Sequence, residues 1–167
     1  MELLLVIFII SLVYYLGFEG VEKSTKKTEK ITPLTLKKSV MNHTLFQGSG
    51  TLLCIDHCRK CYLRKDISTP FEEIEETMAL GDPKVYRINA QDDLYRPDYG
   101  RYQDNEICLI VDFYPNGSST QLILQNDKGT YFLPAFFGKA QKTDSLDDAQ
   151  KLWLVHTKEL KDRGNFY

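Results

Sequence analysis

Residues 107–137 read ICLIVDFYPNGSSTQLILQNDKGTYFLPAFF, and this stretch decides the fold class. It contains three runs rich in β-branched and aromatic side chains, which are typical of strands, at 107–114, 120–125 and 130–137. The two intervening segments, Pro115-Asn116-Gly117-Ser118 and Asn126-Asp127-Lys128-Gly129, consist of residues that favour tight turns. The stretch therefore predicts an antiparallel meander around 107–137.

Two helices are expected to flank this sheet. Residues 70–80, PFEEIEETMAL, begin with proline, carry acids in the first turn and precede Gly81, a pattern that favours a helix. Residues 146–162 have apolar side chains at helical spacing, follow Asp144 or Ser145 as a capping residue and stop before Gly164. Helices near 70–80 and 146–162 packed on an antiparallel sheet predict an α+β fold for a single globular domain over residues 46–167.

The N-terminal residues 3–18, LLLVIFIISLVYYLGF, are apolar and uncharged. We interpret residues 1–20 as a membrane anchor or signal segment and residues 21–45 as a polar tether. Four lysines follow the run and none precedes it, at Lys23, Lys26, Lys27 and Lys30. Basic residues stay on the cytoplasmic side of a membrane, which favours a single-pass signal-anchor and a cytoplasmic domain.

Export is the alternative localisation, with the domain periplasmic, or secreted after cleavage of a signal peptide. Two sequons for N-linked glycosylation, Asn42-His43-Thr44 and Asn116-Gly117-Ser118, agree with export in a eukaryote. A net charge of −2 and a pI near 5.9 argue against a nucleic-acid partner, since such binders carry a basic excess.

Three of the four cysteines lie in residues 53–63, LCIDHCRKCYL. In a reducing compartment, Cys54, His57, Cys58 and Cys61 form a candidate metal site for zinc, with Cys108 as a fourth ligand. After export, Cys108 is instead expected to form a disulfide with one of the other three, since four cysteines allow three pairings. The compartment decides between the two chemistries.

A long polar loop precedes the meander and carries tyrosines interleaved with arginines. These residue types dominate protein interfaces, which predicts a partner-binding surface formed by Tyr95, Arg96, Tyr99, Arg101 and Tyr102.

The sequence contains no nucleophile elbow, phosphate-binding glycine loop or zinc-protease motif. We therefore expect a membrane-tethered, non-catalytic module that binds another protein, such as an immunity protein, an inhibitor or an assembly subunit. It would contact the membrane through residues 3–18 and need no cofactor. The alternatives are a metal-binding or redox thiol protein, and an exported disulfide-bonded domain.

Overall fold

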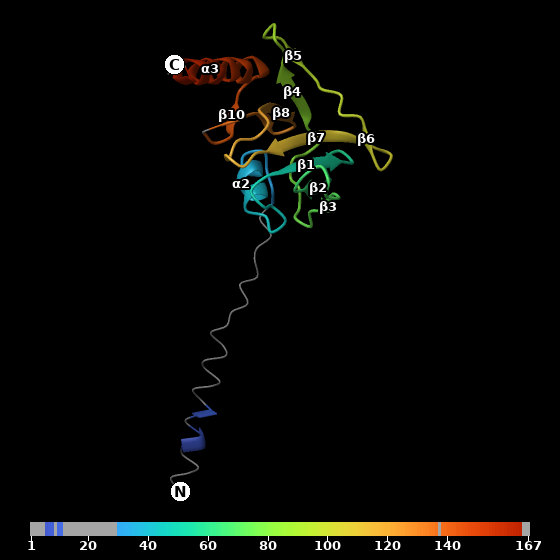
Figure 1. Ribbon diagram of the computed structural model, residues 1–167, viewed down its shortest axis with the longest axis vertical. Coiled ribbons are helices and arrows are strands. Elements are labelled where there is room, and N and C mark those ends of the chain that lie inside the picture. The colour runs from blue at the N-terminus through green and yellow to red at the C-terminus, as the bar shows by residue number, and fades with distance from the viewer. Residues whose placement is uncertain (1–5, 9, 12–29, 137, 165–167) are drawn as a thin grey trace.

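Two antiparallel sheets make up most of the fold, and a helix lies at the C-terminal end (Figure 1). The computed structural model describes residues 6–8, 10–11, 30–136 and 138–164. The first sheet has the strand order β3 (Glu72–Glu73), β2 (Lys60–Arg64), β1 (Gly50–Ile55), β7 (Asn105–Phe113) and β6 (Arg101–Tyr102). The second has the order β10 (Gln141–Thr143), β9 (Gly129–Leu133), β8 (Leu122–Asn126), β4 (Lys84–Ile88) and β5 (Leu94–Tyr95).

The main core lies between the two sheets. It takes Leu52 and Leu109 from the first sheet and Leu122 and Leu133 from the second, all of them buried. Because successive side chains of a strand point to opposite faces, the intervening residues cover the outer faces. Leu53 on β1 packs with Tyr62 outside the first sheet, and Ile123 on β8 packs with Phe132 outside the second.

Helix α3 (Leu146–Gly164) packs on the outer face of the second sheet against β8 and β9, and it lies above β8 in Figure 1. Its first turn is capped by Ser145, whose Oγ accepts a hydrogen bond from the Asp148 amide at 3.1 Å. Trp153 lies 6.3 Å from Phe132 between ring centroids, and Ala149 is fully buried. The predicted helix over 146–162 therefore corresponds to α3.

The predicted meander is split between the two sheets. β8 and β9 form the expected hairpin, closed by the pair Asn126↔Gly129. β7 does not pair with β8; it pairs with β1 and β6 in the first sheet, and only an isolated bridge, Phe113↔Ser119, follows its end. The residues after Tyr114 thus carry the chain from one sheet to the other.

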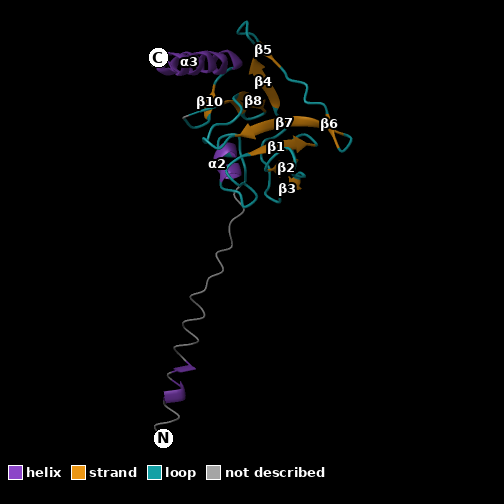
Figure 2. Cartoon of the chain, viewed as in Figure 1, coloured by secondary structure: helices purple, strands orange, loops and turns teal. Residues whose placement is uncertain are grey.

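The predicted helix over 70–80 is wrong. The segment runs extended along the edge of the first sheet, where β3 pairs with β2 and the Ile74 amide donates to the Cys61 carbonyl at 2.8 Å. Further along, Ile31 exchanges backbone hydrogen bonds with Thr77 and Ala79. Pairing with strands far away in the sequence overrides the local helix signals, and the α+β prediction holds only in part: mostly antiparallel sheet with one long helix (Figure 2).

Part of the expected tether belongs to the packed core. Helix α2 (Leu36–Met41) places Leu36 and Val40 at 1% and 0% exposure, and Ile31 before it is also buried. Ile31, Leu36 and Val40 belong to the main core, and Met41 packs against it, so residues 31–41 lie against the sheets.

The prediction of a single-pass membrane anchor requires correction. Among the residues that the structure describes, no helix is both long enough and apolar enough to cross a membrane. Most of the run 3–18 lies outside the described residues.

Candidate functional site: a cleft at the junction of the sheets

A β-bulge in β7 sets up the site. Cys54 on β1 pairs with Leu109, yet the next residue, Ile55, pairs with Ile107, so Cys108 is the extra residue on β7. A bulge re-aims the side chains on the bulged strand. As a result Ile107 packs with the outer cluster while Leu109 remains in the main core. The Cys108 sulfur lies 3.2 Å from the Cys54 carbonyl and reaches the turn that follows β1.

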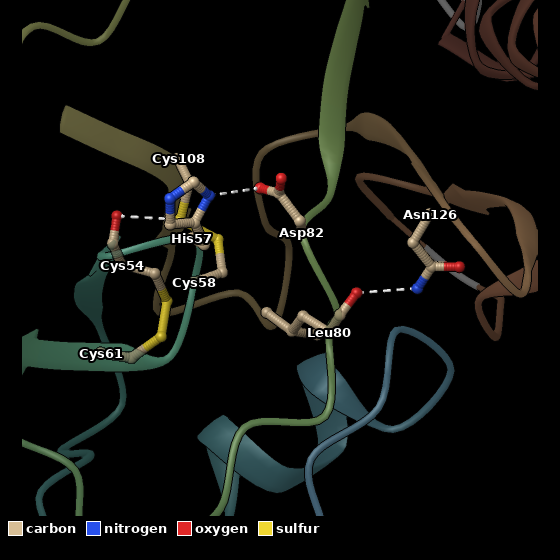
Figure 3. The surroundings of a disulfide bond; sticks show 8 residues. All are labelled: Cys54, His57, Cys58, Cys61, Leu80, Asp82, Cys108 and Asn126. Carbon is tan, nitrogen blue, oxygen red and sulfur yellow. Dashed lines mark hydrogen bonds and ion pairs between the residues drawn. A yellow bond between two sulfur atoms is a disulfide. The ribbon is translucent and has the colours of Figure 1, made fainter.

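All four cysteines are disulfide-bonded, and none is free (Figure 3). Cys54–Cys61 joins directly paired residues of β1 and β2, whose Cα atoms are 4.1 Å apart. Cys58–Cys108 joins the turn to the bulge, with Cα atoms 5.8 Å apart. Cys54, Cys58 and Cys61 are at most 1% exposed. The sulfurs therefore bond to one another in two disulfides, and the predicted cysteine cluster is wrong.

The β1–β2 turn has an unusual backbone. Asp56, His57 and Cys58 all adopt left-handed conformations, with φ of 52°, 52° and 59°. For a residue with a side chain this conformation costs roughly 1–2 kcal/mol. The turn is closed by the Arg59 amide, which donates to the Asp56 carbonyl at 3.0 Å, and is held by both disulfides. The surrounding bonds thus impose a conformation that these residues would not adopt alone.

His57 projects from this turn and forms an ion pair with Asp82, Nδ1 to Oδ1 at 3.1 Å (Figure 3). Asp82 is placed by the residues before it. The Asn126 side-chain amide donates to the Leu80 carbonyl at 2.7 Å, and Gly81 turns the chain with φ of +74°. Both partners of the pair are mostly exposed, at 65% and 74%, so the pair itself contributes little stability.

The cleft lies where the two sheets meet and has a volume of about 340 Å³. Its lining is mostly polar, and buried Val85 on β4 and Ile107 on β7 supply part of the smaller apolar share. Its rim carries exposed charged and polar side chains, namely His57, Asp82, Arg96, Asn105 and Glu106. A second hollow of about 570 Å³, lined in part by Arg59 and Lys128, also borders His57 and Asp82. The ion pair thus stands between two hollows.

Among the tyrosines that the structure describes, Tyr99 alone lines the cleft. Its hydroxyl is buried and has no hydrogen-bond partner among the described residues. Burial raises the pKa of Tyr99 to about 12. Smaller electrostatic effects act as well: Arg87 lowers this pKa, whereas Tyr95 and Asp112 raise it. The hydroxyl is therefore protonated at neutral pH and keeps an unused donor.

The structure does not gather the five predicted partner-binding residues into one surface. Arg96 and Tyr99 line the cleft, whereas Tyr102 packs edge-on against Tyr62 and Phe71. Tyr95 is exposed on β5, and the Arg101 guanidinium donates to the Asp104 carbonyl within the β6–β7 hairpin. The predicted protein-binding surface finds no support, because these side chains divide between a cleft, a packed cluster and a turn.

Among the predicted metal ligands, the cysteines are all in disulfides, and the Nδ1 atom of His57 contacts Asp82. Within the described parts of the chain, no group of three or more His, Cys, Asp or Glu side chains is arranged to hold a metal ion. Sequence reasoning missed Asp82 and Glu106 on the cleft rim. No local motif marks them, since they come together only through the pairing of distant strands.

Comparisons with protein-family models, with curated proteins and with solved structures find no match to this chain.

Proposed function

We propose that the chain is an exported, disulfide-bonded domain that binds a small polar ligand in the cleft at the junction of its sheets. The observation that carries this proposal is the pair of disulfides, in which three of the four cysteines are buried. Stable structural disulfides belong to secreted, periplasmic and other oxidising settings, and are rare in the cytosol. This favours the exported alternative over a cytoplasmic domain.

The cleft supports the binding part of the proposal. Its volume of about 340 Å³ falls within the usual range for small-molecule sites of ~300–1,000 Å³. Such sites combine an apolar lining with a few polar groups that fix the orientation of the ligand. Here Val85 and Ile107 supply a small apolar share of a mostly polar lining, which suits a polar ligand, while Arg96 and Glu106 offer charges of both signs at the rim.

The Cys58–Cys108 bond also links export to binding. Cys108 lines the cleft and Cys58 lines the adjoining hollow, so the disulfide forms part of the wall between them. Oxidation therefore preorganises the cleft by fixing the turn that carries His57. A preorganised site loses less entropy on binding.

Disulfide mapping in protein from the native host tests export. Free thiols are blocked at lysis, and the unreduced chain is cut both with trypsin and with a protease that cleaves before aspartate. Asp56 lies between Cys54 and Cys58, and Arg59-Lys60 lies between Cys58 and Cys61, so all four cysteines separate. We expect two linked peptide pairs, 54 with 61 and 58 with 108. Four blocked thiols would contradict the proposal.

Native mass spectrometry of the same preparation tests binding. We expect a non-covalent adduct that is lost in the double variant Arg96→Ala/Glu106→Gln and retained in Lys158→Ala, a surface change on α3. An adduct that persists in the double variant would contradict binding at the cleft. The proposal would also fail if the chain carried no adduct and no member of a library of small polar compounds stabilised it.

A further inference from the structure

The two N-linked glycosylation sequons, far apart in the sequence, lie next to each other in the fold. Asn42 follows α2, which ends at Met41, and Asn116 follows β7. A side-chain carbon built at Gly117, the middle residue of the second sequon, would lie 3.9 Å from the Met41 Cε atom. Figure 1 shows α2 beside the end of β7. Both sequons therefore sit at one end of the domain.

We infer that Asn42 and Asn116 are both N-glycosylated, an inference that rests on the proposed export. Both asparagines are exposed. No hydrogen bond among the described residues engages the Nδ2 atom of either one. Sequons in surface turns of an exported chain are the usual acceptors for this modification.

The reaction needs a free side-chain amide and a sugar donor of defined class. The Nδ2 atom attacks the anomeric carbon of an oligosaccharide carried on a lipid pyrophosphate. A carbon–nitrogen bond forms, the carbon–oxygen bond to the pyrophosphate breaks, the lipid pyrophosphate leaves, and the amide nitrogen loses one proton. The step is a substitution in which no atom changes its oxidation state, so no oxidant or reductant is required.

At Asn116 the local structure presents the amide for this reaction. Its Oδ1 accepts hydrogen bonds from the Ser118 amide at 3.0 Å and from the Ser118 hydroxyl at 2.7 Å. The turn therefore occupies the oxygen and leaves the nitrogen unused. The turn is fixed further by the Tyr114 amide, which donates to the Ser118 carbonyl at 3.0 Å.

The position of the sequons is compatible with ligand binding at the cleft. β1 and β7 run between the two places, with the pairs Gly50↔Phe113 near the sequons and Ile55↔Ile107 at the cleft. Six residue steps along β7 span about 20 Å at roughly 3.3 Å per residue. Glycans at the far end of these strands thus leave the cleft open, and they cover surface next to the exposed Tyr114 ring.

The test compares the full chain from its native host, and the same chain secreted by eukaryotic cells, before and after treatment with peptide N-glycosidase. We expect two glycans per chain. Thr44→Ala should remove one glycan, whereas Thr44→Ser, which keeps the sequon, should retain both. Asn116→Asp should remove the other glycan while keeping an Oδ1 acceptor for Ser118, so this variant should stay folded.

The outcomes separate this inference from the proposed function. A native chain with both disulfides and no glycan overturns the inference and leaves export standing. A native chain with free thiols overturns both. A single glycan that Thr44→Ala retains and Asn116→Asp removes would refute glycosylation of Asn42. The reverse pattern would refute glycosylation of Asn116.

Discussion

Cys108 is the extra residue of a β-bulge, and its sulfur is bonded to Cys58 in a turn of three left-handed residues. The bulge turns the strand so that Cys108 faces the turn, and the bond holds the turn in a conformation that is costly for residues with side chains. His57 projects from that turn toward Asp82. The Cys58–Cys108 disulfide therefore connects the bulge in β7 to the turn that carries His57 at the cleft.

The two disulfides should differ in their contribution to stability. In the chain-entropy model, a cross-link that closes 50 residues contributes about 4 kcal/mol and one that closes 7 contributes about 2 kcal/mol. The paired variant Cys58→Ser/Cys108→Ser should thus unfold at lower urea than Cys54→Ser/Cys61→Ser. Equal losses, or the reverse order, would show that the length of the closed loop does not set the contribution of each disulfide to stability.

The left-handed turn makes a second prediction. His57→Gly and His57→Ala both remove the exposed ion pair with Asp82, but only glycine adopts φ of 52° freely. The glycine variant should therefore be more stable than the alanine variant by ~1 kcal/mol, measured by urea unfolding. Asp66→Ala, compared with Asp66→Gly, serves as a control, since Asp66 is not among the positive-φ residues. An alanine variant as stable as the glycine variant would contradict an imposed conformation.

The sequence predicts those parts of the fold that local signals determine. Asn126 to Gly129 predicted the β8–β9 hairpin, and Ser145 and the spacing of apolar residues predicted α3. The β1–β2 hairpin escaped prediction because its turn contains neither glycine nor proline. Without that hairpin, the opposition of Cys54 and Cys61 was not visible, and the three disulfide pairings stayed open.

The remaining errors concern partners that lie far apart in the sequence. Residues 70–80 carry good helix signals, yet backbone bonds to Cys61 and Ile31 determine their extended form. Likewise, the apolar sequence of β7 indicates that it pairs with other strands, but it does not identify those strands. The cleft brings together β4, β7 and the β1–β2 turn, so its composition depends on pairings that no local pattern contains.

Gly81 should be intolerant of a side chain. Its φ of +74° disfavours any other residue, and an added carbon would lie 3.3 Å from the Asp127 Oδ1 atom and 3.4 Å from the Asn126 Cβ atom. Gly81→Ala is expected to destabilise the protein by more than ~1 kcal/mol and to weaken ligand binding by displacing Asp82. The matched control is Gly100→Ala, which has φ of +72° but nothing within 4 Å of the added carbon. Equal losses in urea unfolding would show that only the backbone conformation matters at Gly81.

Tyr99 should make the stability depend on pH in the alkaline range. Burial raises the pKa of Tyr99 to about 12 in the folded protein, from about 10 for an exposed tyrosine. A raised folded-state pKa means that the stabilisation is complete below the unfolded value and is lost as pH rises through the folded one. The free energy of unfolding should therefore fall between about pH 10 and 12. Tyr99→Phe should flatten this part of the profile, whereas Tyr114→Phe, at an exposed tyrosine outside the cleft, should leave it unchanged. Urea unfolding at each pH, together with ultraviolet absorbance of the phenolate, measures both effects. A Tyr99→Phe profile as steep as that of the parent would place the alkaline loss at another group.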